Sequence, residues 1–242
     1  MTLDDLLHQH ALAAYDKRVY LSAMHGKHAW ELRLDLGTLT FVGPHDVREE
    51  YAVQFLGTHS ETQHTWLWAW ANEAMFAHAQ HLASALELRA LGAHEAIAEL
   101  QSAELQLDGS AHAQKADMPD KLAFIASGVC RAGAHFRASY PDGTLTMLIK
   151  DARFKRPVQR PLARVARIVP MFFSDHHLSD PVRAFTHYLE FYRLEPVVQQ
   201  VDGSTHVTAH PRAGRDAIQL ERNNLVAEFD ASGAFRRIST AG

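Results

Sequence analysis

The sequence has 242 residues, a formal net charge of −4 and 47% hydrophobic residues. These values are typical of a globular chain with one large domain or two small ones, because disordered chains have fewer apolar residues and a larger net charge. No apolar run reaches the ~18 residues of a membrane-spanning helix, so we expect no membrane partner.

The first residues and the cysteine content favour a cytoplasmic location. Residues 1–5, Met-Thr-Leu-Asp-Asp, lack the basic and apolar regions of a secretory signal. The single cysteine, Cys130, excludes an intrachain disulfide and suits a reducing compartment. Because Cys130 follows an apolar helical pattern, we interpret it as a core residue rather than a nucleophile.

The chain begins with a pattern of period 3.6, which predicts an amphipathic helix over residues 3–24. Thr2 is placed to cap its N-terminus, and Asp4 and Asp5 suit the positive end of the helix dipole. Gly26 predicts its end.

The pattern then changes to period 2, which predicts three strands. Residues 30–36 alternate apolar and charged side chains, as in a half-buried strand. Gly37 marks a turn or bulge, and residues 39–41 form the return strand. A further strand is expected at 51–56, ending at Gly57.

Residues 65–71, Thr-Trp-Leu-Trp-Ala-Trp-Ala, predict a strand of unusual composition. Strand alternation places Trp66, Trp68 and Trp70 on one face and small or aliphatic residues on the other. This face is either an aromatic platform for a flat ligand or part of a core beneath a helix, and we favour the core.

Helices and a hairpin follow in the middle of the chain. Asn72 is a good N-cap for a helix over 73–91; its amide could instead meet a ligand, but capping already explains it. A second helix is expected from the Asp-Met-Pro-Asp start at 117–120 to about Cys130. Residues 135–150 predict a hairpin around Pro-Asp-Gly.

A proline-containing stretch at 151–161 predicts a boundary between two subdomains. Beyond it we expect helices at 162–172 and 181–194, the second capped by Asp180 before a proline. The remainder predicts a strand meander with turns at Asp202-Gly203, near Gly214, at Asn223-Asn224 between strands 218–222 and 225–230, and at Ala231-Ser232-Gly233. The predicted fold class is therefore α+β, with mostly antiparallel sheets and packed helices, in domains 1–155 and 162–242.

The Trp-Leu-Trp-Ala-Trp-Ala-Asn box at 66–72 resembles that of an uncharacterised bacterial family, domain of unknown function 6882. The hairpin at 30–41, the Gly57-Thr58 step and the turn at 140–143 resemble it too. The likeness is best over residues 28–150. It implies no activity, substrate or catalytic residue.

A basic stretch gives a second candidate site. Residues 150–167 hold seven basic side chains and one acid, and Arg160, Arg164 and Arg167 would share one face of a helix. They could meet an acidic partner or phosphate; a solvated linker is the alternative that we favour. Because the chain as a whole is acidic, we do not expect nucleic-acid binding.

Histidines give a third candidate site, a metal site. The chain has 17 histidines, and Asp175, His176 and His177 resemble a fragment of a phosphoesterase metal motif whose other carboxylates are missing. Metal sites need three or four converging ligands. We expect no cofactor, and a divalent metal at these residues is the alternative.

These patterns lead to a hypothesis about function rather than to a reaction. The sequence shows no glycine-rich phosphate loop, Gly-x-Ser-x-Gly elbow or His-Glu-x-x-His motif. We therefore predict a non-enzymatic cytosolic protein-binding module, an immunity-type or regulatory partner of another protein. The alternative is a metal-dependent hydrolase or small-ligand enzyme that uses the histidines.

Overall fold

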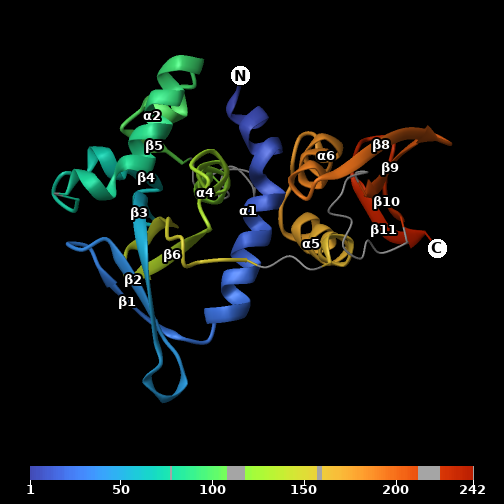
Figure 1. Ribbon diagram of the computed structural model, residues 1–242. Coiled ribbons are helices and arrows are strands. Elements are labelled where there is room, and N and C mark those ends of the chain that lie inside the picture. Colours follow the sequence, from blue (N-terminus) through green and yellow to red (C-terminus); the bar gives the residue numbers. More distant parts are fainter. Residues whose placement is uncertain (77, 108–117, 157–159, 212–223, 242) are drawn as a thin grey trace. The chain divides into compact units, whose positions relative to one another are not determined.

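The computed structural model describes residues 1–76, 78–107, 118–156, 160–211 and 224–241 (Figure 1). Within these ranges the chain has an α+β fold with one seven-stranded and one four-stranded antiparallel sheet, which confirms the predicted class. It divides into two compact units. The first is Met1–Leu6 with Ala14–Arg156, and the second is Leu7–Ala13 with Pro157–Gly242.

A seven-stranded sheet forms the centre of the first unit. Its strands run in the order β1-β2-β3-β4-β5, and β7 pairs with β3 and with β6. Their bounds are β1 Ala29–Arg33, β2 Thr38–Val42, β3 Arg48–Ser60, β4 Thr65–Trp68, β5 Glu104–Gln106, β6 Ala134–Tyr140 and β7 Gly143–Ile149.

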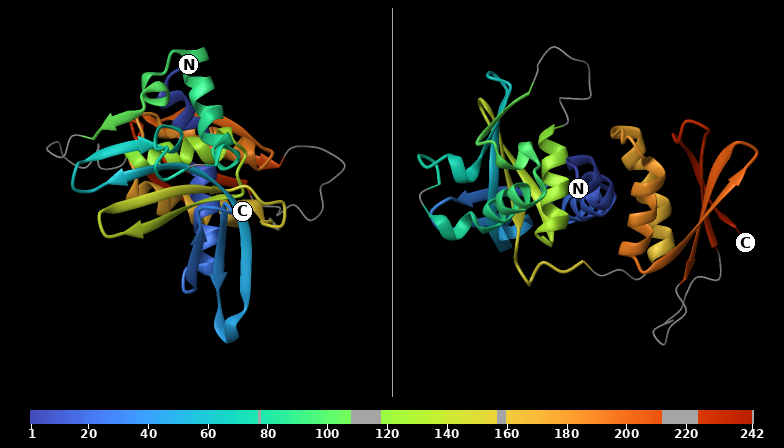
Figure 2. Two further views of the ribbon diagram at one scale, coloured as in Figure 1. Left: turned by 90° about the vertical axis from the view of Figure 1, so that its left-hand side faces the viewer. Right: turned by 90° about the horizontal axis from the view of Figure 1, so that it is seen from above.

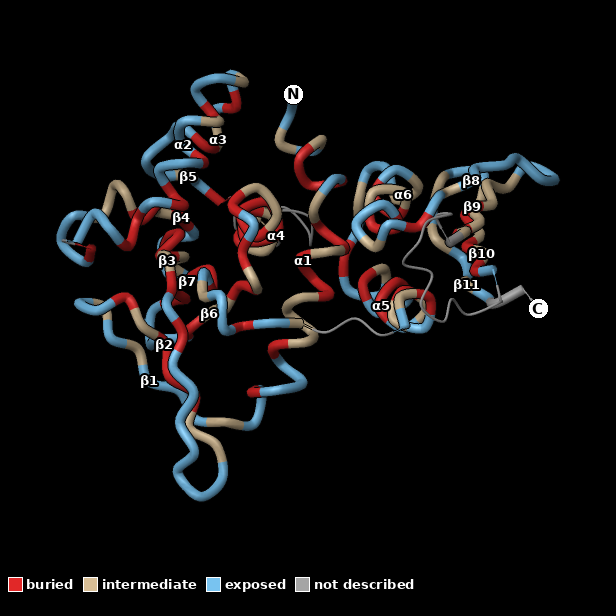
Figure 3. Tube along the Cα trace, viewed as in Figure 1, coloured by how far each residue is buried: buried red, intermediate tan, exposed pale blue. Residues whose placement is uncertain are grey.

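The long strand β3 joins two parts of this sheet. Residues 48–52 pair with β2, whereas residues 53–60 pair with β7 and residues 57–60 also with β4. The register shifts between Phe55 and Gly57, and such an irregularity bends a strand and increases its twist. Figure 3 shows that buried residues concentrate along β3 and β7.

The helices α1 and α4 of the first unit begin where the local chemistry predicts. In α1, Leu3–His25, Thr2 and Asp5 form a complete capping box, and the helix ends at Gly26 as expected. The helix α4, Met118–Val129, packs against α1 through Tyr15 and Phe124, whose ring centroids lie 6.4 Å apart. The other two helices are α2 Ala83–Glu95 and α3 Ala98–Gln101.

Two predicted strands have wrong bounds. The strand expected at 30–36 is the shorter β1, because Gly37 has φ +62° and residues 34–37 form its turn. The strand expected to end at Gly57 continues to Ser60. A side chain at Gly57 would lie 2.6 Å from the ring of Trp66, so this glycine allows a close approach inside a strand and does not end it.

The helix predicted at 73–91 is also wrong, since α2 begins only at Ala83. Asn72 does accept a hydrogen bond at Oδ1 from the Met75 amide, at 3.2 Å, but it closes a single turn. Phe76 then stacks on Phe55 of β3 at 5.0 Å between ring centroids. This contact between residues that are far apart in the sequence holds the segment in a turn. The spacing of apolar residues within the segment does not reveal it.

The second unit has two helices on one face of a four-stranded sheet (Figure 2). The helices are α5 Pro161–Asp175 and α6 Pro181–Phe191, and Asp180 caps α6 by accepting from the Arg183 amide. The strand order is β11-β10-β9-β8, with bounds β8 Leu194–Val201, β9 Ser204–Pro211, β10 Asn224–Phe229 and β11 Phe235–Ala241.

The predicted turns of the meander are confirmed where the structure describes them. Asp202 and Gly203 both have positive φ, and Gly233 has φ +83°. The strand expected at 218–222, the loop near Gly214 and residue Asn223 lie outside the described residues. The helix α6 ends at Phe191, three residues before the predicted end. No helix among the described residues is long and apolar enough to cross a membrane.

Candidate functional site

The first unit contains a cavity of about 240 Å³ at the curved end of its sheet. Residues from α1, β2 and β6 line it, so the chain brings together segments more than 100 positions apart. The lining residues are Arg18, Leu21, Ser22, His25, Gly26, Phe41, His135, Phe136 and Arg137.

Aromatic rings form one wall of this cavity. The His25 imidazole stacks on Phe41, with 4.3 Å between ring centroids and 6° between planes, and Phe136 meets Phe41 edge-on at 5.4 Å. Trp30 in turn meets Phe136 edge-on at 5.7 Å and remains 40% exposed. The wall is therefore apolar and continues to the surface.

Two arginines and one carboxylate supply the charge next to this wall. Asp120 Oδ1 accepts from Arg137 Nη1 at 2.9 Å and lies 3.5 Å from Arg18 Nη1. Arg137 Nη2 also donates to Thr144 Oγ1 at 3.2 Å. Both guanidinium groups therefore approach the same carboxylate oxygen.

His25 belongs to a hydrogen-bonded chain behind the wall. Its Nδ1 lies 3.2 Å from Nδ1 of His28, and its Nε2 lies 3.4 Å from the hydroxyl of Tyr51. Tyr51 donates to Glu49 at 2.7 Å. Burial lowers the pKa of His25 and outweighs the opposing attraction of Glu49, so the imidazole is neutral at neutral pH and both ring nitrogens are engaged.

Together these features suit an organic anion. The aromatic wall would pack against a flat or aliphatic group, and the arginine pair would meet a negative charge. None of the residues lining this cavity was predicted from the sequence to be a site residue. The sequence signal that could have pointed to this region is the predicted hairpin at 30–41, in which Trp30 lies opposite Phe41. Such a cross-strand aromatic pair brings two rings together on one face of a hairpin.

The tryptophan box lies elsewhere in the first unit. Trp66 and Trp68 are both 0% exposed and meet edge-on at 5.6 Å, which confirms their predicted burial. The prediction that Trp70 shares their face is wrong, because the strand ends at Trp68 and Trp70 lies in the short 3-10 helix η2, Ala69–Ala71. The Trp70 side chain is half-buried, and the guanidinium carbon of Arg89 lies 4.2 Å from its ring centroid. The single turn closed by Asn72 follows directly.

The basic stretch divides between the two units. In the first, Arg153 pairs with Asp151 at 2.6 Å and Arg156 pairs with the buried Asp16. Arg153 therefore pairs with an acid of the stretch itself, and Arg156 pairs with an acid outside it.

The remaining three arginines lie at the start of α5 in the second unit. Arg160 precedes the helix, and Arg164 and Arg167 follow at helical spacing. Arg160 and Arg167 are exposed, whereas Arg164 is half-buried.

The proposed metal ligands lie at the end of α5. The Asp175 carboxylate accepts from Ser174 at 2.7 Å, and His176 is buried against the ring of Phe172 at 5.0 Å. His177 is exposed. Among the residues that the structure describes, no three His, Cys, Asp or Glu side chains are grouped so that they could hold a metal ion.

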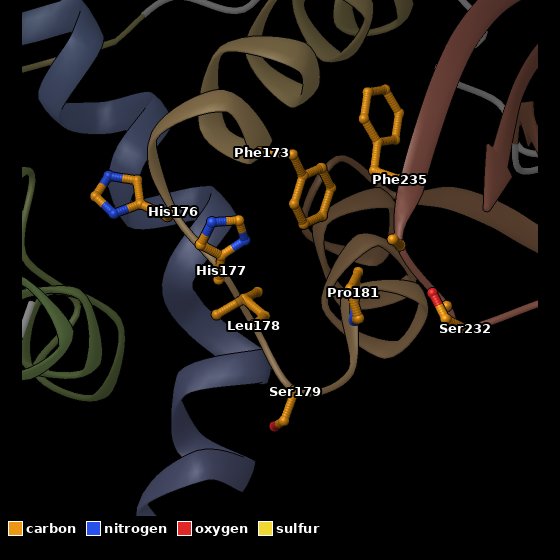
Figure 4. Close-up of a pocket in the computed structure, with 10 residues that line it drawn as sticks. Phe173, His176, His177, Leu178, Ser179, Pro181, Ser232 and Phe235 are labelled. Atoms are coloured by element: carbon orange, nitrogen blue, oxygen red, sulfur yellow. The ribbon is translucent and has the colours of Figure 1, made fainter. Parts of the chain in front are cut away.

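His176 and His177 do line a second cavity, of about 210 Å³. Figure 4 shows the connection between α5 and α6 facing the turn that leads into β11. Phe173 stacks on Phe235 there at 5.1 Å, which fills part of the space with aromatic side chains.

The first unit is thus an α+β domain with a cavity that is lined by aromatic rings and by Arg18 and Arg137. The chain belongs to DUF6882, a family of unknown function, whose model matches residues 4–152. That match includes every residue of the cavity and ends at residue 152, before the helix α5. No curated protein and no solved structure matches the chain.

Proposed function

We propose that this chain is a cytosolic protein-binding module, an immunity-type or regulatory partner of another protein, and that its first unit carries the binding surface. The observation that supports this proposal is the exposed apolar arm formed by β1, β2 and the start of β3. Trp30, Leu36 and Val47 on this arm are 40%, 54% and 59% exposed.

The chemistry of the arm is that of an interface. Trp30 lies on β1, Leu36 in the turn before β2, and Val47 directly before β3. Exposed apolar side chains are frequent in binding surfaces, and tryptophan and arginine are the residues that most often dominate binding energy. Strand β1 lies at the end of the path, and among the strands that the structure describes it pairs with β2 alone. A partner strand can therefore add to its other edge through main-chain hydrogen bonds.

The cytosolic location is supported by the thiol content. The chain has one cysteine, and Cys130 is only 2% exposed. A chain of this kind needs no disulfide and suits a reducing compartment. A partner in the same compartment is then the simplest match.

The test is affinity capture from the native host with matched variants. Trp30→Glu and Val47→Asp place charge on the arm, whereas Leu86→Glu does the same at another exposed site on α2, where Leu86 is 41% exposed. We expect the wild type and Leu86→Glu to retain the same protein and both arm variants to lose it. Titration of the purified partner then measures the loss.

An immunity-type role also predicts that the captured partner is toxic. Its expression alone should arrest growth, and coexpression with the wild-type chain, but not with Trp30→Glu, should restore it. A partner that leaves growth unaffected would favour the regulatory role. Retention of the same proteins by all variants would contradict binding through the arm.

A further inference from the structure

Strand β8 forms one edge of the sheet in the second unit (Figure 1). It pairs with β9, and within the described residues no strand pairs with its other side. Residues 197–201 read Val-Val-Gln-Gln-Val, and all five are exposed, the three valines by 36%, 50% and 40%. Such an edge presents main-chain N–H and C=O groups next to apolar side chains, and these groups can pair with a strand of another chain.

The last five residues of β8 lack the charges that β1, β5 and β11 carry at other sheet edges. Glu31 lies on β1, Glu104 on β5 and Arg237 on β11. Charged side chains on an edge strand oppose pairing with another chain. Because residues 197–201 contain no charged side chain, nothing of this kind protects the outer end of β8.

The hairpin between β8 and β9 determines which main-chain groups point outward. Val201 pairs with Ser204 across the two-residue turn at 202–203, and both turn residues have positive φ. The pair that closes such a turn exchanges both of its hydrogen bonds, and bonded pairs then alternate along the strands. The N–H and C=O groups of Val198 and Gln200 therefore point to the open edge.

A symmetric antiparallel register of two β8 strands satisfies these outward groups. When Gln199 lies opposite Gln199 of a second copy, Val198 pairs with Gln200 of that copy and exchanges two hydrogen bonds with it. The two-fold axis repeats the same pair on its other side. Pro196 is the next outward residue and has no N–H, and this register leaves it beyond the ladder.

The side chains are complementary in the same register. Alternation places Val197, Gln199 and Val201 on one face, so Val197 of each copy lies opposite Val201 of the other. Cross-strand pairs of β-branched side chains pack well on a sheet. A glutamine amide both donates and accepts, so the two Gln199 side chains can bond to each other. The segment is thus complementary to itself.

We infer that β8 is the contact surface of a homodimer, in which the sheets of two second units join edge to edge into one continuous antiparallel sheet. A second copy is the partner because the register is symmetric and because the segment has no charge that would select a different chain. This inference does not depend on the partner proposed for the first unit. It assigns a role to a part of the chain that lies beyond the family match at residues 4–152.

The test places charge at Gln199, the residue that faces its own copy, and measures dimerisation of the full chain by analytical ultracentrifugation at pH 8. We expect the wild type to dimerise within a concentration series that reaches about 1 mM. Gln199→Glu alone and Gln199→Lys alone should each dimerise about tenfold more weakly or worse, because like charges then lie directly opposite. An equimolar mixture of the two variants should recover the dimer, since each Glu then faces a Lys.

Ser239→Glu is the matched control. Ser239 is exposed on β11, the strand at the opposite edge of the same sheet, so this variant should dimerise like the wild type. A wild type that stays monomeric overturns the inference. A dimer that survives both single variants, or a mixture that does not recover it, overturns it as well. So does a dimer that is lost in Val47→Asp but retained in Gln199→Glu, because the contact would then lie on the arm of the first unit.

Hydrogen exchange of the wild type provides a second measurement, which decides the question if the Gln199 variants fail to fold. The amides of Val198 and Gln200 should become protected as the protein concentration rises. The amides of Gln199 and Val201 should be protected at every concentration, because β9 already holds them. Exchange at Val198 and Gln200 that is fast and independent of concentration overturns the β8 contact.

Discussion

Trp30 meets Phe136 edge-on at 5.7 Å, although the two residues lie on strands that do not pair with each other. Trp30 is on β1, at one end of the sheet, and Phe136 is on β6, which pairs only with β7 within the described part of the chain. The contact shows that the sheet curls until two of its edges approach. Phe41 of β2 and Phe136 of β6 line the cavity, so the cavity lies where these strands approach. The bend of β3, which pairs with β2 and β7, therefore creates the candidate site.

Trp30 should be the tryptophan most accessible to solvent quenchers. It is 40% exposed, whereas Trp66 and Trp68 are 0% exposed. Trp30→Phe is expected to remove most of the acrylamide-quenchable fluorescence and to change the melting temperature little. Trp70→Phe is the control, since Trp70 is half-buried under Arg89. Unchanged quenching in Trp30→Phe would contradict the exposed arm.

Trp68 should be essential for stability. Its ring is fully buried, and its indole N–H donates to the Glu99 carbonyl at 3.0 Å. Trp68→Ala is expected to lower the free energy of unfolding by about 3–5 kcal/mol, the usual cost of removing a core aromatic. Trp68→Phe, measured by the same urea denaturation, should cost less because most of the apolar contact remains. A variant that melts like the wild type would contradict a core role.

Gly37 should tolerate no side chain. Its φ is +62°, and a Cβ there would lie 2.2 Å from Nδ1 of His81. Gly37→Ala is expected to cost about 1–3 kcal/mol, the range for a residue held in a disfavoured backbone region, plus the displacement of the His81 ring. The double variant Gly37→Ala, His81→Ala should recover only the steric part. Equal stability of Gly37→Ala and wild type would show that this turn rearranges freely.

These cases also show what can be predicted from sequence. The caps by Thr2 and Asp180 are local, because a side chain meets a backbone group three residues away, and both are foreseen. The burial of Trp66 and Trp68 was predicted from their alternation in a strand, although Trp70 leaves that strand. The late start of α2 depends on Phe76 reaching Phe55, and no local pattern records a contact of that kind.

The cavity was missed for a related reason. Its charge comes from Arg18, Asp120 and Arg137, which are far apart in sequence and meet only through tertiary packing. In the sequence, nothing distinguishes any one of the three from an ordinary surface charge. A histidine-rich segment, in contrast, attracts notice because Asp175, His176 and His177 are adjacent, but adjacency along the chain does not make side chains converge.

Lys17 should make stability rise with pH in the alkaline range. Its Nζ donates to the Ala132 carbonyl at 2.9 Å, and burial, with Arg156 next, lowers its pKa from 10.5 to about 8. Between these two values the unfolded chain binds more protons than the folded one, so the free energy of unfolding increases as pH rises.

Lys17→Met removes this dependence. The difference in unfolding free energy between wild type and Lys17→Met should therefore shift in favour of the wild type between pH 7.5 and pH 10, measured by urea denaturation. Lys121→Met is the control. Parallel pH profiles for wild type and Lys17→Met would show that Lys17 keeps its ordinary pKa in the folded protein.

Cys130 should be unreactive until the protein unfolds. The thiol is 2% exposed and donates to the Ser84 carbonyl at 3.5 Å. Burial raises its pKa to about 12, and the thiolate is the form that attacks thiol reagents. In native buffer we expect iodoacetamide to label no thiol, and in denaturant to label one. A cysteine introduced at the exposed Val47, in a Cys130→Ala background, provides the control and should react at once. Rapid labelling of native Cys130 would mean that the helix α4 opens locally, which the packing of Phe124 against Tyr15 does not suggest.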